Sequence, residues 1–93
     1  MKRQSSRLRK DVQFELSVEP GSRVFVAGTF NNWNPTANPL ADNPGSGHCK
    51  ATLRIPVGRH EYKFVVNDEW HVDPNCPEWA PNDQGSLNSV LHV

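Results

Sequence analysis

Apolar and polar side chains alternate along most of this chain, in short segments separated by turn residues. Nearly every second residue is apolar in residues 12–18 (VQFELSV), 49–55 (CKATLRI) and 59–66 (RHEYKFVV). This period of two is typical of a β-strand with one buried face. Shorter apolar runs predict further strands at residues 23–27, 69–72 and 86–93, and a short strand near Leu40.

The segments between the predicted strands are rich in Pro, Gly and Asn, which favour turns and loops. Residues 28–35 (GTFNNWNP) form an Asn-rich bend around Trp33, and residues 36–47 and 73–85 read as long loops. With six or seven short strands and no helical periodicity, the pattern predicts one all-β domain, a sandwich or a barrel.

Asn67-Asp68 predicts a tight two-residue hairpin turn, because both residue types tolerate positive φ. Such a turn pairs Val65 with Trp70, and alternation then places Lys63 and Trp70 on one face of the sheet. The opposite face, with Tyr62 and Phe64, is richer in apolar side chains and is expected to be the core. Trp70 is therefore expected on the outer face, diagonal to Lys63.

Composition and charge exclude several function classes. The chain has 93 residues and a formal net charge of zero. Five of its ten basic residues lie in residues 1–10, which contain no acid, so the remainder is net acidic and unsuited to nucleic acid. We expect residues 1–10 to be a disordered basic tail and residues 11–93 to form the domain.

Membrane insertion and secretion are not expected. The chain lacks an apolar run of about 18 residues, and no apolar stretch follows its charged start. Cys49 and Cys76 are therefore expected to be reduced thiols in a cytoplasmic protein, with Cys49 buried on its strand.

The sequence offers no catalytic, metal or cofactor constellation. Asp68-Glu69 lies in a predicted turn without a burying pocket, and the histidines lack the spacing of zinc ligands. The glycines are isolated, so no phosphate-binding loop is present.

Trp33 and Trp70 lie beside turns among polar neighbours, and this placement suggests a sugar-binding surface. An indole face stacks on the apolar face of a pyranose ring, and a neighbouring cation or amide bonds its hydroxyls. The alternative is packing: Trp70 covers a gap at the edge of a sandwich, and Trp33 plugs the core beneath its loop.

Three segments in order, residues 24–35 (VFVAGTFNNWNP), 59–74 (RHEYKFVVNDEWHVDP) and 85–93 (GSLNSVLHV), resemble the family 48 carbohydrate-binding modules. This family includes the glycogen-binding domain of the AMP-activated protein kinase β subunit and the N-terminal modules of isoamylases and branching enzymes. The resemblance implies an immunoglobulin-like β-sandwich of about seven antiparallel strands that binds α-1,4-glucans such as glycogen or starch.

The resemblance also implies the residues that contact sugar. The stacking tryptophans of the family correspond to Trp33 and Trp70, and its sugar-contacting lysine to Lys63. Its C-terminal asparagine corresponds to Asn88, and the small hydroxyl residue two positions earlier to Ser86.

Two positions depart from the family. In the kinase β module, a leucine just before the glycine of the last loop can reach through a sugar ring. Gln84 occupies this position here, so the resemblance gives less support for binding of branched or cyclic glucans. Trp79 is an extra aromatic residue in the last long loop. It is either a third sugar platform or a hydrophobic plug.

We therefore expect a non-catalytic glucan-binding module that needs no cofactor and contacts neither nucleic acid nor membrane. The alternative is an interaction or spacer module that contacts a glycan-active enzyme or kinase partner without binding sugar. In a regulatory form of this alternative, the basic tail docks on an acidic partner.

Overall fold

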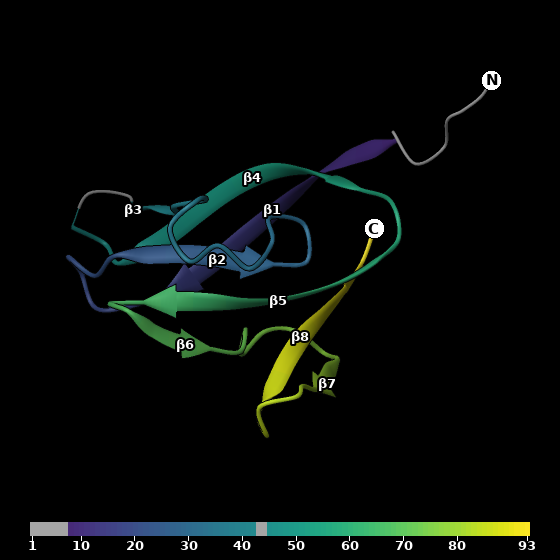
Figure 1. Ribbon diagram of the computed structural model, residues 1–93. Helices are drawn as coiled ribbons and strands as arrows, with labels where there is room; N and C mark the ends of the chain where they lie inside the picture. Colours follow the sequence, from purple (N-terminus) through teal and green to yellow (C-terminus); the bar gives the residue numbers. More distant parts are fainter. Residues whose placement is uncertain (1–7, 43–44) are drawn as a thin grey trace.

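Two antiparallel β-sheets pack face to face in the computed structural model, which describes residues 8–42 and 45–93 (Figure 1). This confirms the predicted all-β, immunoglobulin-like sandwich. The strands are β1 (Arg9–Ser17), β2 (Val24–Gly28), β3 (Ala41–Asp42), β4 (His48–Pro56), β5 (Arg59–Val66), β6 (Glu69–His71), β7 (Trp79–Pro81) and β8 (Leu87–His92). No helix able to cross a bilayer occurs in this described part of the chain.

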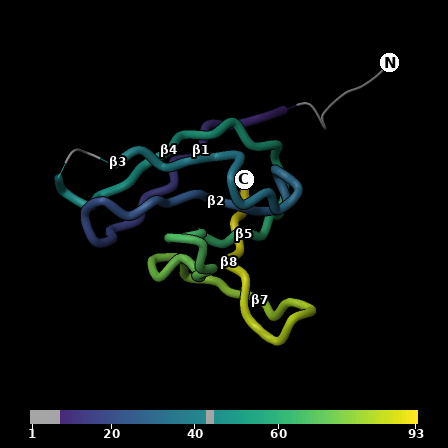
Figure 2. The backbone as a smooth tube through the Cα atoms, turned by 60° about the vertical axis from the view of Figure 1, so that its left-hand side comes forward, coloured from purple at the N-terminus to yellow at the C-terminus, as the bar shows by residue number. Residues whose placement is uncertain are grey.

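The first sheet has the order β1-β4-β3, and the second has the order β2-β5-β8-β7. Strand β5 is the centre of the second sheet. One of its edges pairs with β2, and the other pairs with β8 along residues 59–62 and with β6 along residues 64–66. Figure 2 shows the two layers from another side, with the loop between β7 and β8 projecting from the second.

The core lies between the sheets, where the alternating faces of β1 and β5 meet. Phe14 packs edge-on against Tyr62 with ring centroids 5.1 Å apart, and Phe30 lies 5.6 Å from Phe14. Phe64 is fully buried. Edge-to-face contacts suit the quadrupoles of aromatic rings, so these side chains hold β5 firmly against β1. The predicted core face is confirmed.

Several predicted boundaries were wrong. Strand β1 begins at Arg9, because its pairing with β4 continues to Pro56, so Arg9 and Lys10 belong to the sheet and not to a tail. Residues 1–7 lie outside the described residues. The segment predicted as a loop at 73–85 contains β7, which pairs with β8.

The outer face of β5 carries a buried apolar residue beside Lys63. Val65 lies on this face, as alternation from Lys63 requires, and is buried. Its two cross-strand neighbours are Phe25 on β2 and Trp70 on β6, both large side chains that cover a residue between them. The contact with Val65 helps to hold the side chain of Trp70 in place on this face.

Both cysteines are free thiols. Cys49 is buried, as predicted, and Cys76 is partly exposed. Burial and the nearby carboxylate of Asp42 raise the pKa of the Cys49 thiol, which keeps it in its neutral form.

Candidate functional site

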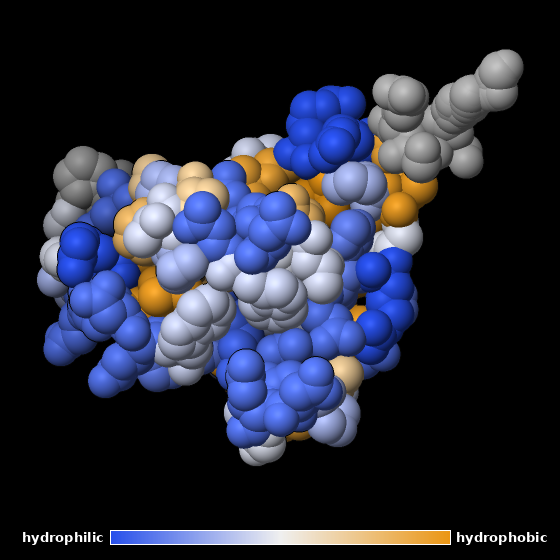
Figure 3. All heavy atoms as spheres, in the orientation of Figure 1, coloured by the Kyte–Doolittle hydropathy of each residue, from blue (hydrophilic) through white to orange (hydrophobic). Residues whose placement is uncertain are grey.

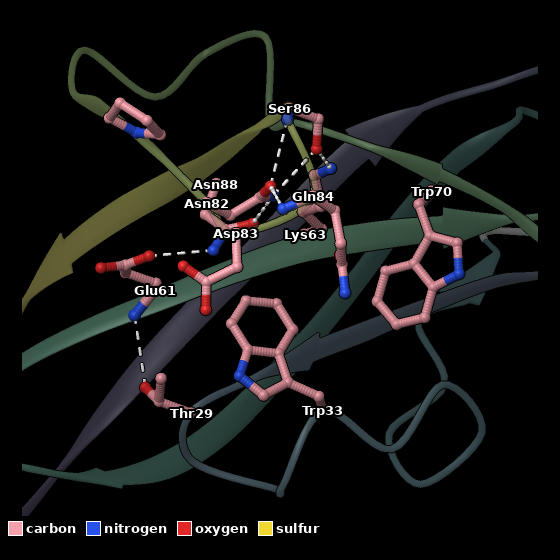
Figure 4. Close-up of a pocket in the computed structure, with 11 residues that line it drawn as sticks. Thr29, Trp33, Glu61, Lys63, Trp70, Asn82, Asp83, Gln84, Ser86 and Asn88 are labelled. Carbon is pink, nitrogen blue, oxygen red and sulfur yellow. Dashed lines mark hydrogen bonds between the residues drawn. The ribbon is translucent and has the colours of Figure 1, made fainter.

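A cleft of about 860 Å³ opens between the Asn-rich bend after β2 and the turn that joins β7 to β8. In Figure 4 the indoles of Trp33 and Trp70 lie on one side of the opening, and Asn82 and Ser86 lie on the other. The surrounding face of the molecule is mostly hydrophilic (Figure 3). The cleft is lined by Thr29, Trp33, Glu61, Lys63, Trp70, Pro81, Asn82, Asp83, Gln84, Ser86 and Asn88.

Trp33 is held by a bend that folds back on the end of β2. Its backbone N–H and that of Asn31 donate to the carbonyl of Gly28, at 2.9 and 3.1 Å. Asn32 and Trp33 both have positive φ, 58° and 57°. Gly28 admits no side chain, since a Cβ there would lie 2.5 Å from the carbonyl oxygen of Glu61. The bend is thus pressed against β5.

The side chain of Asn31 is the internal brace of this bend. Its Oδ1 accepts from the Gly28 N–H at 3.0 Å, and its Nδ2 donates to the carbonyl of Val26 at 3.0 Å and to Oδ1 of Asn38 at 2.7 Å. Phe30, the neighbouring residue, packs against the core. The alternative in which Trp33 plugs the core is therefore wrong: Phe30 takes that place, and Trp33 lines the cleft.

Trp70 is placed by the β5–β6 hairpin with the register that the sequence predicted. Val65 pairs with Trp70 and Val66 with Glu69. The turn residues Asn67 and Asp68 have φ of 48° and 71°, as a type I′ turn requires. Trp70 is 44% exposed, so part of its indole face is available to a ligand.

A chain of hydrogen bonds crosses the floor of the cleft. Nζ of Lys63 donates to Oγ of Ser86 at 2.8 Å, and Nδ2 of Asn82 donates to the same oxygen at 2.8 Å and to Oδ1 of Asn88 at 3.0 Å. Nδ2 of Asn88 then donates to Oε1 of Glu61 at 2.9 Å. Each side chain in this hydrogen-bond network is oriented by its neighbour in the network.

Glu61 is the charged end of this chain. Its Oε2 accepts from Arg59 at 2.7 Å, and its Oε1 from Asn88. These two hydrogen bonds, with that from Asn88 the larger influence, hold the pKa of the Glu61 carboxyl below its ordinary value. Both carboxylate oxygens already have partners within the protein. The main effect of Glu61 in the cleft is therefore to orient the side-chain amide of Asn88.

Six of the seven candidate ligand contacts lie around this one cleft: Trp33, Lys63, Trp70, Gln84, Ser86 and Asn88. Trp79 does not line it. Its side chain is 47% exposed, and its Nε1 donates to the carbonyl of Asp73 at 3.3 Å. The structure thus brings together residues that are up to 55 positions apart in sequence.

Sequence reasoning missed other residues of the cleft. Glu61 shares a strand face with Lys63, so strand alternation alone could have indicated it. Asn82 and Asp83 lie in a turn whose direction the sequence does not specify. No three His, Cys, Asp or Glu side chains among the described residues gather closely enough to hold a metal ion.

The cleft combines a partly exposed indole (Trp33), an exposed indole (Trp70) and fixed hydrogen-bonding side chains. Proteins hold sugars with this combination, and the sandwich with its cleft defines a carbohydrate-binding module. The family model described as the glycogen recognition site of AMP-activated protein kinase matches residues 11–93, and the chain belongs to this family. The predicted relationship to family 48 modules is confirmed.

Curated relatives agree with this family. The chain is 39% identical over 75 residues to the β-2 subunits of 5′-AMP-activated protein kinase from Homo sapiens and Mus musculus, covering 81% of this chain and 26% of theirs. It is 33% identical over 73 residues to the β-1 subunit from Sus scrofa, covering 78% of this chain and 56% of that one. The chain thus spans about a quarter of the length of the β-2 subunits.

Proposed function

We propose that this module binds α-1,4-glucans, such as glycogen or maltooligosaccharides, by stacking glucose units on Trp33 and Trp70. The observation that carries the proposal is that these two indoles, one from the bend after β2 and one from strand β6, line one cleft. Two aromatic faces on one side of an opening match successive sugar rings of a curved chain. The glycogen recognition family supports the choice of an α-glucan.

The polar side of the cleft has hydrogen-bonding capacity left for sugar hydroxyls. Lys63 uses one of its three N–H donors on Ser86, and the Ser86 hydroxyl accepts twice and retains its own proton to donate. Asn88 is only 7% exposed and spends its amide on Asn82 and Glu61, keeping one N–H and one lone pair. Its contribution is largely to position its neighbours.

Affinity for a short oligosaccharide is expected to be weak, on the order of micromolar to millimolar, because each stack gains little after desolvation and sugar ordering. Tight retention on a polymer requires several modules or several contacts on one chain. We further propose that the module is non-catalytic and serves a glycan-active enzyme or a kinase complex. The cytoplasmic location stays a prediction.

Calorimetric titration with maltoheptaose tests the proposal. Trp33→Ala and Trp70→Ala are each expected to weaken binding by about tenfold or more, because each removes one stacking face. Trp79→Ala is the matched control: it removes an exposed indole outside the cleft and is expected to leave the affinity unchanged. Thermal melts confirm that each variant is folded.

Absence of glucan binding would favour the alternative function, an interaction or spacer module. If the folded native protein gives no heat with maltoheptaose and is not retarded in a glycogen-containing native gel, glucan binding is rejected. The module is then an interaction or spacer domain, and a protein partner is sought instead.

A further inference from the structure

Asp83 is a cleft residue that the functional assignment leaves unused. It lines the same opening as Trp33, and in Figure 4 its carboxylate lies between the side chains of Glu61 and Trp33. Among the described residues, its side chain has no hydrogen-bond or ion-pair partner. Glu61, the other carboxylate of the cleft, has both oxygens engaged.

The backbone that carries Asp83 is fixed by the side chain and backbone of Asn82. Oδ1 of Asn82 accepts from the N–H groups of Gln84 and Ser86 at 3.0 and 3.1 Å, and the Asn82 N–H donates to the carbonyl of Ser86 at 2.9 Å. Gly85 completes the turn with a φ of 78°. A ligand that bonds to Asp83 therefore has to order only its short side chain and not the turn.

We propose that Asp83 is a specificity-determining residue that accepts hydrogen bonds from neighbouring hydroxyls of the glucose unit stacked on Trp33. An ionised carboxylate only accepts, and its two oxygens match a pair of adjacent hydroxyl donors. The inference rests on the proposed glucan function and adds an acceptor opposite the donors Lys63 and Ser86.

The same charge selects against anionic sugars. Arg59 pairs with Glu61, and the Lys63 ammonium is bound to Ser86, so Asp83 is the cleft carboxylate without a cation paired to it among the described residues. A phosphorylated glucan brings further negative charge toward an uncompensated carboxylate, which is repulsive. The position beside Asp83 is therefore selective for a glucose unit without a phosphate group.

Calorimetry with maltoheptaose and with maltoheptaose 6-phosphate tests the inference. Asp83→Ala is expected to weaken maltoheptaose binding about three- to tenfold, because it removes a charge-assisted acceptor. Asp83→Asn keeps the shape and is expected to reduce the preference for the neutral sugar by about threefold. Asp11→Asn, which removes the same charge from β1 on the other sheet, is expected to change neither quantity.

The outcomes separate this inference from the function on which it rests. If both Asp83 variants match the native protein with both sugars while Trp33→Ala loses binding, the role of Asp83 is rejected and glucan binding stands. If the native protein binds neither sugar, the glucan function fails, and the role of Asp83 fails with it.

Discussion

Trp33 has a backbone conformation that aromatic residues rarely adopt. A φ of 57° in the left-handed region costs about 1–2 kcal/mol for an L-residue. The hydrogen bond from the Trp33 N–H to Gly28 and the bracing by Asn31 offset that cost. Strain that the surroundings hold in place is common at binding sites, and here its effect is to keep the indole in the cleft.

At the same scale, Glu61 gives the protein a predictable response to acid. Its folded pKa lies below the ordinary glutamate value of about 4.3. The stability that the carboxylate contributes is therefore complete above that ordinary value and is lost as the pH falls through the folded pKa. Relative to Glu61→Gln, the native protein is expected to hold a constant advantage from about pH 7 to pH 5 and to lose it at lower pH.

Urea unfolding of both proteins across this pH range measures the effect. Glu19→Gln is the control, because Glu19 is exposed and its carboxylate has no partner among the described residues. An advantage that shrinks between about pH 7 and pH 5, or that persists unchanged below about pH 3, contradicts the assignment to Glu61.

At the scale of elements, the bend at residues 28–38 depends on one amide. Asn31→Ala removes three hydrogen bonds and leaves the Gly28 N–H and the carbonyl of Val26 without their side-chain partner. We expect the free energy of unfolding to fall by about 1–3 kcal/mol and maltoheptaose binding to weaken several-fold, because Trp33 loses its support. Calorimetry and urea unfolding measure the two effects.

Asn32→Gly is the matched control within the same bend. The Asn32 side chain is exposed and has no partner among the described residues. Glycine adopts the φ of 58° at this position without strain, so the substitution removes only an amide that faces solvent. Stability and binding are both expected to stay close to those of the native protein. Equal effects of the substitutions at Asn31 and Asn32 would mean that the bend needs no internal brace.

The β5–β6 hairpin and its register could be predicted from the sequence. A two-residue turn fixes which residues of the two strands pair, and the strand period of two fixes the face on which each side chain lies. The sequence alone therefore predicts that Trp70 and Lys63 share the outer face of the sheet. Strand β7 could not be predicted, since Trp79–Pro81 is three residues long and ends in a proline that donates no hydrogen bond. Asp83 was missed for a related reason: its direction depends on bonds from the Asn82 side chain to later backbone N–H groups.

At the scale of the whole molecule, the two sheets have separate tasks. The first sheet covers the core face of β5 through Phe14 and Leu16. This leaves the outer face of the second sheet free to carry Lys63 and Trp70, with loops from both of its ends adding Trp33 and Ser86. Because the sheet that bears these residues is anchored in the core, the proposed glucan binding is expected to require little rearrangement of the cleft.

Nuclear magnetic resonance of the three indole N–H groups, each assigned with a Trp→Phe variant, tests the glucan platform most directly. On titration with maltoheptaose, the signals of Trp33 and Trp70 are predicted to shift together along one saturable curve. The signal of Trp79, which lies outside the cleft, is predicted to stay in place. Shifts confined to Trp79, or no shift at saturating sugar, would contradict the two-tryptophan platform.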